Sequence, residues 1–553
     1  MRTFAEIVRS RADDGKVGLR FGEQQWTWAE VVQEGADRAA VLASIPRSGR
    51  QLHAGVLLEN TPDYLFWTCG AALTGSALIG INPTRRGAEL AGDIRHTECD
   101  LIVTEDRLSD LLEGVDHGVR PDRVLNVDSA GYRDLLTAHR GAALPETLPD
   151  ASDIMLLLFS SGSTGAPKAV ICSQGRLAGL ADALAVRTEL TRESVSYLCM
   201  PLFHGNSMMM NFTPSLKVGA TIALARKFSA SGFVRDIHTY QATYVNYVGR
   251  ALSYVLAVPP DPRDQHSSLS LAVGTEASVS DIERFAARFG CRVSEGYGLS
   301  EGVLRINRTP DTPPDSIGLP VGGADVRVMN EETGVECPPA VFDGAGRLCN
   351  ADVATGQIVG IGMAAAFEGY YRNPEAYNER VRGADFWTGD LAYRDATGYF
   401  YFAGRSSDWL RVDSENFSAA PVERILERWA PVAVALVYAV PDPRTGDQVM
   451  CTLQLKSDVE FDPDAFTAFL DAQPDLGTKW RPRFVRVASE VPTTGSNKVA
   501  KTVLRRAAWN TADPVFWRTG AEMTYRLLDQ RQQQAYEAEF ADHGRAALIP
   551  SAA

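Results

Sequence analysis

Short apolar runs alternate with longer amphipathic stretches through the first part of the chain. The run at 54–58, for example, is closed by Glu59 and Asn60, which is typical of a short buried strand. Thr27 followed by Glu30 forms a capping-box pattern and predicts the start of a helix. The alternation predicts parallel sheets with helical crossovers. The predicted strands are residues 18–21, 54–58, 77–81, 101–104 and 123–127, and a further helix is predicted at 62–74.

The pattern changes near residues 401–409, which we interpret as a domain boundary. A smaller α/β pattern follows it, and from Ala507 the chain has helical character without candidate chemistry. The strands predicted after the boundary are residues 432–440, 450–455 and 484–487, with a helix at 463–472.

A hydroxyl-rich loop separates two apolar runs within residues 156–170, which predicts a strand, a tight loop and a second strand. Glycines let backbone N–H groups approach a polyphosphate closely, and the hydroxyls and Lys168 can donate to its oxygens. The loop is not the G-x-x-x-x-G-K-[ST] loop, because Lys168 follows Pro167 and no helix start follows it. A Ser/Gly-rich surface turn is the alternative.

Length and charge narrow the class of protein. At 553 residues the chain exceeds the size of one hydrophobic core, so two or more domains are expected. The net charge of −14 opposes general binding to nucleic acid or to an anionic membrane. Eight scattered cysteines without a C-x-x-C pair favour a reducing compartment, so we expect the cytoplasm.

No segment has the composition of a leader or a membrane span. Residues 1–11 lack the apolar core of a signal peptide. Residues 64–82 are the most membrane-like run, but glycines and polar residues interrupt it. We therefore expect a buried helix and strand there and no transmembrane segment. The sequence leaves the oligomeric state open, a homodimer included.

Several turns after apolar runs carry side chains suited to nucleotide chemistry. Tyr297 lies between two glycines and can stack on a base, and Glu301 can hold Mg2+. Asp390 follows a glycine in a predicted tight turn, where one carboxylate can bind both hydroxyls of a ribose. Ordinary turn chemistry is the alternative for each, since Gly and Asp are common turn residues.

Three further features are candidates for an acid pocket. His204 follows an apolar strand and precedes a Gly turn, so it either lines a cleft or has the commoner structural role. Residues 208–210 are methionines that open a helical run and fill a core or form an adaptable wall. Arg305 follows Glu301 closely and can pair with an anion, or form a surface or interdomain ion pair.

Together these loops resemble the adenylate-forming superfamily of acyl-CoA synthetases, peptide-synthetase adenylation domains and luciferases. The resemblance covers residues 10–510 and looks strongest to actinobacterial fatty-acid–CoA ligase-like proteins of the very-long-chain and fatty-acid-transport-protein branch. The stretches that carry this closer match are residues 200–204, 308–314 and 398–405.

The resemblance implies an α/β fold with a large N-terminal domain of stacked βαβ sheets and a small mobile α+β domain. The implied bounds are 1–403 for the large domain, 404–408 for a hinge and 409–553 for the small domain. The implied reaction is an ATP-dependent, AMP-forming ligation in which an acid oxygen attacks the α-phosphorus and pyrophosphate leaves. The activated acid then passes to an acceptor nucleophile, with ATP and Mg2+ required and CoA as the expected acceptor.

The same resemblance assigns roles to individual residues. Lys498 of the small domain and Glu301, which holds Mg2+, are implied to be catalytic, as is His204, the gate of an acid pocket that includes Met209 and Arg305. The residues implied to bind ATP or AMP are Ser160, Ser161, Gly162, Ser163, Thr164, Gly165, Lys168, Gly274, Thr275, Glu276, Gly296, Tyr297, Gly298, Leu299, Ser300, Asp390, Phe402 and Arg405.

The chain departs from the family pattern at Ser414, where relatives normally have Gly at the border of the pantetheine channel. The added Cβ and hydroxyl narrow that channel and predict impaired thiol transfer, unless a small backbone shift accommodates them. Thr275 and Leu299 also replace the Asn and Ser that are usual in this branch, which indicates a substrate unlike a plain long acyl chain.

Two alternatives therefore stay open at the level of sequence. One is a diazotase-like enzyme of secondary metabolism, which activates nitrite with ATP for N–N bond formation with an amine or hydrazine, without CoA. The other is a non-catalytic relative that binds AMP or an acyl ligand. The presence of Lys498, Glu301 and Asp390 together opposes the second alternative.

Overall fold

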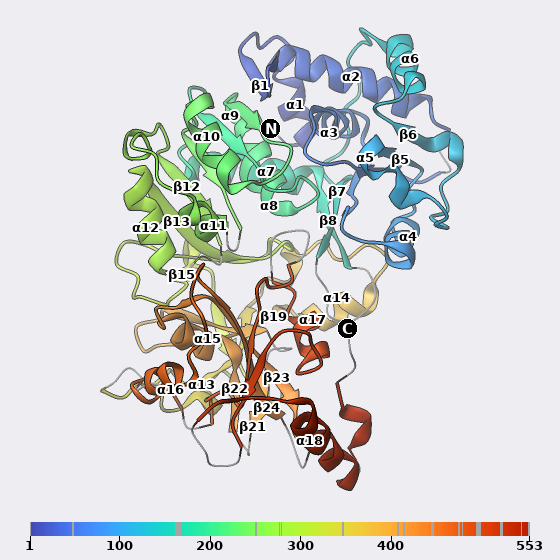
Figure 1. Cartoon of the computed structure of the whole chain (residues 1–553). Coiled ribbons are helices and arrows are strands. Elements are labelled where there is room, and N and C mark those ends of the chain that lie inside the picture. The colour runs from blue at the N-terminus through green and yellow to red at the C-terminus, as the bar shows by residue number, and fades with distance from the viewer. Residues whose placement is uncertain are drawn as a thin grey trace. The chain divides into compact units, whose positions relative to one another are not determined.

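The computed structural model contains two compact units (Figure 1). The first comprises Met1–Arg305 and Ala365–Glu379, and the second Ile306–Ala364, Arg380–Thr494 and Val499–Ala553. The predicted hinge at 404–408 stays a prediction, since residues 406–408 are not described. The described residues are 2–46, 49–160, 168–248, 251–275, 277, 279–344, 348–405, 409–412, 415–443, 447–473, 476–477, 479–493, 499–519, 524–543 and 545–550.

One sheet of the first unit carries the predicted phosphate loop. Its strands are hydrogen-bonded in the order β6 (Val124–Asn126), β5 (Leu101–Thr104), β3 (His53–Leu57), β4 (Ala77–Gly80), β7 (Ile154–Ser160) and β8 (Lys168–Ser173). The pairs are parallel except for β7 and β8, which form an antiparallel hairpin. The strands predicted from the apolar runs in this region are confirmed.

A second sheet presents the carboxyl ends of its strands next to one another. β1 and β2 are antiparallel and the other pairs are parallel, so the ends of β12 and β13 lie at the same edge. Within the first unit its strands follow the order β13 (Arg292–Gly298), β12 (Leu271–Gly274), β11 (Tyr244–Asn246), β9 (Val195–Leu198), β10 (Thr221–Leu224), β1 (Val17–Phe21) and β2 (Gln24–Thr27).

Helices cover these sheets, and the predicted capping box is confirmed. The Thr27 hydroxyl accepts a hydrogen bond from the Glu30 amide at 3.2 Å, and the Glu30 carboxylate accepts one from the Thr27 amide at 2.7 Å. The α-helices are α1 (Phe4–Arg9), α2 (Trp28–Ser44), α3 (Pro62–Thr74), α4 (Gly87–His96), α5 (Asp106–Ser109), α6 (Ala130–His139), α7 (Gln174–Arg187), α8 (Gly205–Ser207), α9 (Thr213–Val218), α10 (Ala230–Tyr240), α11 (Ala251–Ala257), α12 (Val279–Phe289) and α14 (Pro374–Arg380).

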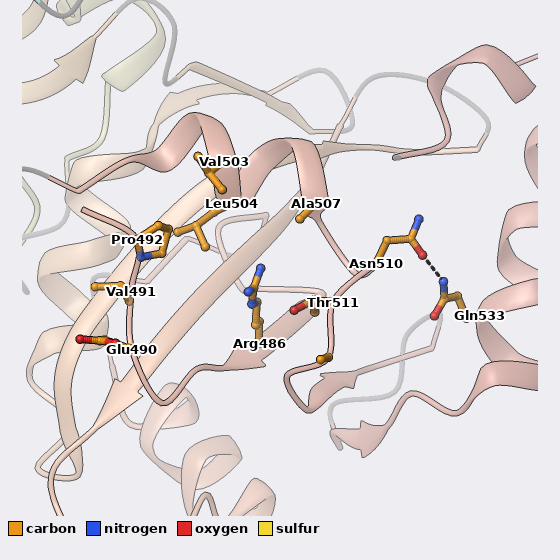
Figure 2. Close-up of a pocket in the computed structure, with 11 residues that line it drawn as sticks. Arg486, Glu490, Val491, Pro492, Val503, Leu504, Ala507, Asn510, Thr511 and Gln533 are labelled. Carbon is orange, nitrogen blue, oxygen red and sulfur yellow. Dashed lines mark hydrogen bonds between the residues drawn. The ribbon is translucent and has the colours of Figure 1, made fainter. Parts of the chain in front are cut away.

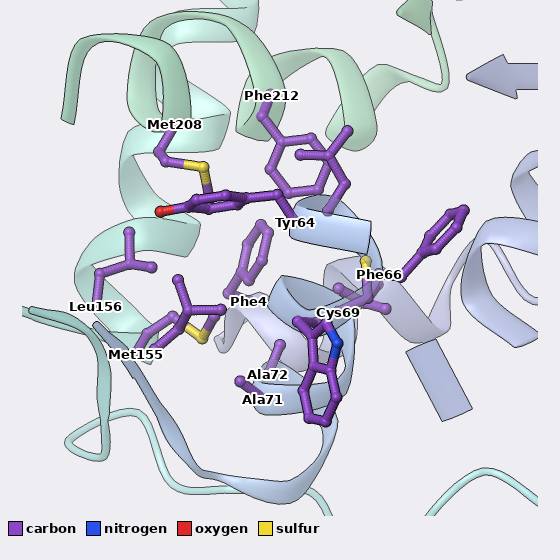
Figure 3. Close-up of a cluster of buried hydrophobic side chains, with 14 of the residues drawn as sticks. Phe4, Tyr64, Phe66, Cys69, Ala71, Ala72, Met155, Leu156, Met208 and Phe212 are labelled. Atoms are coloured by element: carbon purple, nitrogen blue, oxygen red, sulfur yellow. The ribbon is translucent and has the colours of Figure 1, made fainter. Parts of the chain in front are cut away.

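The core of the first unit joins segments that are distant in the sequence. Phe4, Tyr64, Met208 and Phe212 pack together among buried aliphatic side chains (Figure 3). The run at 64–82 is buried as α3 and β4, as predicted. Among the described residues, no helix combines the length and apolar composition needed to cross a bilayer.

The second unit contains two larger sheets. One has the order β16 (Val326–Met329), β17 (Gly356–Gly360), β19 (Asp385–Arg394) and β18 (Val381–Arg382), with β20 (Phe400–Arg405) also paired to β19. The other has the order β23 (Val432–Pro441), β24 (Asp447–Leu455), β25 (Phe484–Val487), β26 (Val515–Trp517) and β27 (Arg526–Leu527). The remaining elements are β14 (Arg305–Asn307), β15 (Leu319–Pro320), β21 (Trp409–Val412), β22 (Glu415–Ser418), α13 (Ala351–Ala354), α15 (Ala419–Glu427), α16 (Pro463–Asp471), α17 (Lys501–Ala507) and α18 (Gln530–Asp542).

The prediction of a helical tail after Ala507 is wrong in part. β26 and β27 extend the last sheet before α18 begins, with Phe484 opposite Trp517 in the register of β25 and β26. Trp517 and Tyr536 pack against Phe484 in the same core cluster. This aromatic burial stabilises strand pairing that the local sequence pattern does not reveal.

Candidate active site

The two strands predicted on either side of the candidate phosphate loop are confirmed. β7 and β8 pair up to Ser160 and Lys168, which lie opposite each other and close the loop. The loop itself, residues 161–167, is not described, so contacts of Ser161, Gly162, Ser163, Thr164 and Gly165 with phosphate stay predictions. The hairpin fixes the two ends of the loop.

Lys168 has a partner that the sequence does not indicate. Its side chain is 6% exposed, and its ammonium lies 2.9 Å from a carboxylate oxygen of Glu379 on α14. The ion pair neutralises the charge at the end of the loop and anchors β8 to the segment after residue 365. Direct contact between Lys168 and phosphate stays a prediction.

Glu301 is buried and is oriented by one tyrosine. Tyr370 is 5% exposed and donates its hydroxyl hydrogen to a Glu301 carboxylate oxygen at 2.5 Å. Tyr370 forms a bridge with Val170, and the Tyr371 amide donates to the Ala169 carbonyl at 2.8 Å. The strand that leaves the phosphate loop therefore also positions the tyrosine that holds Glu301.

The carboxylate of Glu301 fits a partial magnesium site. Mg2+ prefers hard oxygen ligands and usually keeps waters or substrate phosphates in its coordination sphere. Among the described residues, no group of three or more His, Cys, Asp or Glu side chains is placed to hold a metal. Glu301 would therefore hold the ion together with phosphate oxygens and water.

Arg176 connects the turn that contains Ser300 to the same strand. Its guanidinium donates to the Ser300 carbonyl at 2.8 Å and to the Ile171 carbonyl at 2.7 Å. Glu368 lies 3.7 Å from Arg176 and accepts the Ser173 hydroxyl at 2.5 Å. Sequence reasoning missed Tyr370, Arg176, Glu368 and Glu379. Their only signal is residue type, because their partners Glu301, Ser300, Ser173 and Lys168 lie between 69 and 211 residues away in the chain.

Two of the segments predicted to bracket adenine lie side by side, on the neighbouring strands β12 and β13. Gly274 at the end of β12 lies opposite Glu295 of β13, and Gly296, Tyr297 and Gly298 complete β13. A Cβ at Gly274 would lie 2.5 Å from the ring of Tyr247, so only glycine fits there. Thr275, Tyr297 and Leu299 are half-buried. Glu276 is not described, and contacts of all these residues with adenine stay predictions.

In the second unit, Asp390 and the backbone of Arg405 lie opposite each other on β19 and β20. The tight turn predicted before Asp390 is wrong: β19 is one strand in which Gly389 takes a positive φ of 73°. A Cβ at Gly389 would lie 2.0 Å from the Arg380 guanidinium, so the glycine also makes room for this side chain. Asp390 is 9% exposed, and its amide donates to the Thr388 hydroxyl at 3.1 Å.

Phe402 on β20 is half-buried, and its carbonyl accepts a hydrogen bond from Arg424 at 3.1 Å. The side chain of Arg405 is not described. Lys498 and Ser414 lie outside the described residues. The catalytic role of Lys498 and the effect of Ser414 on the pantetheine channel therefore stay predictions.

The residues predicted for the acid pocket lie on or beside one helical segment. His204 lies directly before α8, and its ring is tilted against Phe203 with centroids 4.3 Å apart. Residues Met208–Phe212 form a π-helix (η3), in which Met209 is buried. Arg305 donates to the sulfur of Met210 at 3.9 Å. The predicted helical run at the methionines is confirmed, and π-turns of this kind are common at functional sites.

A cavity of about 650 Å³ lies apart from these residues, in the second unit (Figure 2). It is bordered by α17 and by the chain after it, and Figure 2 shows Asn510 and Gln533 hydrogen-bonded at its rim. Arg486 on its wall is paired with Asp513 at 2.7 Å. None of the described residues predicted for the active site lines this cavity, so it is no part of the predicted site.

Residues 6–371 match the family described as AMP-binding enzyme, and residues 421–498 match its C-terminal domain. The chain belongs to the AMP-binding enzyme family. Steroid-22-oyl-CoA synthetase from Rhodococcus jostii (strain RHA1) is 48% identical over 546 residues, 98% of each chain. The medium/long-chain-fatty-acid–CoA ligase FadD17 from Mycobacterium marinum (strain ATCC BAA-535 / M) is 40% identical over 515 residues, 93% of this chain and 98% of that protein.

Solved structures agree in fold. ATP-bound MatB from Rhodopseudomonas palustris aligns with a TM-score of 0.78 at 22% identity, over 92% of this chain and 98% of that chain. The anthranilate CoA ligase AuaEII in complex with anthranoyl-AMP aligns with a TM-score of 0.79 at 21% identity, over 92% and 97%. The predicted α/β fold class is therefore confirmed, and the family match given above confirms the predicted superfamily.

The predicted reaction class is confirmed as well. AMP-binding enzymes named CoA synthetase or CoA ligase cover nearly the whole chain at 40–48% identity, so this chain is an AMP-forming acid–CoA ligase. The nitrite-activating alternative and the predicted impairment of thiol transfer find no support in these relatives. ATP and CoA are the nucleotide and acceptor of this class.

Proposed function

We propose that this ligase activates a steroid side-chain carboxylic acid, with medium- or long-chain fatty acids as the second candidate class. The observation that carries the proposal is the identity of 48% to steroid-22-oyl-CoA synthetase over 98% of both chains, against 40% to the fatty-acid ligases. Thr275 and Leu299, which depart from the fatty-acid branch, agree with this order.

The proposed first step joins an oxygen of the acid to the α-phosphorus of ATP and releases pyrophosphate. Glu301, held by Tyr370, contributes one carboxylate ligand for Mg2+, which supplies neutralisation of phosphate charge when bound. Lys498 donates from its ammonium group to the oxygens that gain charge in the transition state. Asp390 accepts from the ribose hydroxyls, and Tyr297 stacks on adenine.

The proposed second step exchanges the leaving group. The thiol sulfur of CoA attacks the carbonyl carbon of the acyl adenylate, the thiol proton leaves, and the bond to the AMP oxygen breaks. The products are the thioester and AMP. His204, at the start of the helical segment with Met209, borders the acid and excludes water from the adenylate.

The experiment that tests the function measures pyrophosphate release and AMP formation with panels of acids, each with and without CoA. The panels hold steroid side-chain acids, fatty acids of graded length and nitrite with amines. We expect CoA-dependent turnover with the highest kcat/KM for a steroid acid. Turnover with nitrite in the absence of CoA, or a preference for plain fatty acids, contradicts the proposal.

Lys498→Ala tests the assigned catalytic lysine. We expect adenylate formation to fall by about 100- to 1,000-fold, because one charged transition-state donor is lost, while ATP affinity is nearly unchanged. Lys501→Ala is the matched control: its ammonium is paired with Glu423 at 2.7 Å, so it should retain adenylate formation. Pre-steady-state formation of the acyl adenylate and equilibrium ATP binding are the measurements. Normal adenylate formation in the Lys498 variant would refute the role.

A further inference from the structure

Arg305 is a half-buried arginine without a carboxylate partner among the described residues. Its recorded hydrogen bond is to a thioether, the sulfur of Met210 at 3.9 Å, which is a weak acceptor. A guanidinium has five N–H donors and is costly to dehydrate when they stay unused. The packing around Arg305 therefore leaves donors for something other than the described side chains.

A second arginine, Arg187, is close enough for its charge to act on Arg305. Arg187, the last residue of α7, is also half-buried and has no carboxylate partner among the described residues. Burial, followed by the positive charge of Arg187, lowers the pKa of Arg305 to about 10. Burial also lowers the pKa of Arg187. The charged form of each arginine is thus disfavoured by burial, and no carboxylate among the described residues offsets this cost.

A polar side chain that contacts Met210 is already used. The hydroxyl of Tyr244 is buried and donates to the Met210 carbonyl at 2.6 Å, which fixes the π-helix against β11. The thioether of Met210 therefore accepts from Arg305, while the backbone carbonyl of Met210 accepts from Tyr244. None of these contacts supplies the anionic or carbonyl oxygen that a guanidinium prefers.

The helical segment connects the arginines with the proposed acid pocket. The π-helix follows α8 directly, so Met209 and Met210 belong to the same segment that His204 precedes. A Cβ at Gly205, next to His204, would lie 3.6 Å from the sulfur of Met209. Arg305 thus contacts the wall that begins at the proposed gate of the pocket.

We propose that Arg305, together with Arg187, forms a specificity site for an acid that carries a second oxygen acceptor, a ketone or a second carboxylate. This acceptor lies away from the carboxyl group that is activated, and the guanidinium donates to it through its paired N–H groups. The inference rests on the proposed function and narrows its substrate class from hydrophobic acids in general to acids with an oxygen at the far end.

The test compares acids that share one carbon skeleton and differ only in a distal ketone, a distal carboxylate or neither. Initial rates of pyrophosphate release with ATP, Mg2+ and CoA are measured for the wild type and for Arg305→Met, Arg305→Lys and Arg187→Met. Arg263→Met is the matched control, because Arg263 is exposed and paired with Asp261. Thermal unfolding of each variant provides a readout independent of activity.

We expect Arg305→Met to lower kcat/KM for the oxygen-bearing acid by about 10- to 100-fold, mainly through KM, and to lower it much less for the plain acid. Arg305→Lys should restore part of the loss, and Arg187→Met should act in the same direction. The melting temperature of Arg305→Met should not fall, since an unpaired charge is removed from a half-buried site.

Equal losses for both acids, or a lower melting temperature with unchanged discrimination, would overturn the specificity site and leave the ligase function intact. A wild type that uses plain and oxygen-bearing acids equally well would overturn it too. A wild type that releases no pyrophosphate with any acid contradicts the proposed function itself, and the two failures are thus distinguished. A preference for the ketone over the carboxylate, or the reverse, identifies the acceptor.

Discussion

At the scale of single residues, two groups expected at the nucleotide depend on partners supplied by one distant segment. Tyr370 orients Glu301, and Glu379 neutralises Lys168. Both partners belong to Ala365–Glu379, a segment of the first unit that follows Ile306–Ala364 of the second unit in the sequence. This segment pairs with β8 through the bridge between Tyr370 and Val170. The chemistry of each motif residue is therefore set by its type, whereas its orientation is set by a neighbour outside the motif.

Tyr370→Phe tests this positioning role. The substitution removes the hydroxyl that donates to Glu301 and keeps the buried ring. We expect the affinity for Mg2+ in the nucleotide complex to fall by about 10-fold, because a ligand that loses its orienting hydrogen bond binds more weakly. Mn2+ binding in the presence of ATP, together with the Mg2+ dependence of pyrophosphate release, measures the change.

Tyr371→Phe is the control for that prediction. The hydroxyl of Tyr371 donates to Glu98 at 2.6 Å and has no recorded bond to Glu301. Its loss should leave the metal dependence unchanged. A similar shift in both variants would mean that the tyrosines act on the packing of the segment and not on Glu301.

Asp93 provides a pH-dependent test of stability. It is 2% exposed on α4, and burial raises its pKa from 3.8 to about 6, although Arg85 at 2.9 Å opposes the shift. The folded state binds this proton more tightly than the unfolded state, so the contribution to stability is full below pH 4 and is lost as pH rises through 6.

Asp93→Asn should therefore stabilise the protein at neutral pH and lose this advantage toward pH 4. The expected gain at pH 7.5 is about 1–3 kcal/mol, less what the ion pair with Arg85 contributes. Thermal unfolding from pH 4 to 8 measures it. Exposed Asp122→Asn is the control, and a constant difference across the whole range would contradict the assignment.

At the scale of elements, the π-helix rests on a chain of buried amides. Asn211 accepts the Ser196 hydroxyl at 2.6 Å and donates to Asn246 at 2.7 Å, and Asn246 donates to Asn206 at 2.5 Å. The side chains of Ser196, Asn211 and Asn246 are fully buried. A connected polar network of this kind specifies one register of the helix against β9 and β11.

Asn211→Leu should break this network and displace the π-helix. Buried groups of Ser196 and Asn246 lose their partner, which we expect to cost about 2–4 kcal/mol of stability. The KM for the acid should rise as well, because Met209 lies on the displaced helix. Denaturant unfolding and acid titrations measure the two effects. Asn378→Leu, at an exposed position of α14, should change neither.

At the scale of the whole molecule, each unit has a core of its own. The first unit packs Tyr64, Met208 and Phe212 between its sheets and helices, and the second packs Phe484, Trp509 and Phe540 around its last sheet. The chain after Ala507, beyond the region that matches the family's C-terminal domain, contributes β26, β27 and α18 to that second core.

Phe540→Ala should thus destabilise the second unit selectively. Removal of a fully buried phenylalanine costs about 3–5 kcal/mol, so one calorimetric transition should move to lower temperature while the transition of the first unit stays in place. Gln534→Ala, exposed on the same helix, is the control. A shift of both transitions together would show that the units unfold as one.

Local patterns in the sequence were enough to predict several elements. Strand periodicity placed β3, β5 and β25, Thr27 and Glu30 placed the start of α2, and the hydroxyl-rich loop identified the hairpin of β7 and β8. The motif residues also identified the family. These features depend on the backbone preferences and side-chain types of neighbouring residues, which the sequence states directly.

The way in which the motif side chains are held depends on contacts between distant parts of the chain. The partners of Glu301, Lys168 and Arg305, and the strand pairing of the tail, join residues that are far apart along the chain. No local pattern encodes such a pairing, because its energy arises when desolvated groups meet and depends on the whole packing around them. The need for glycine at position 389 of β19 likewise depends on Arg380, whose guanidinium occupies the space that a Cβ would take.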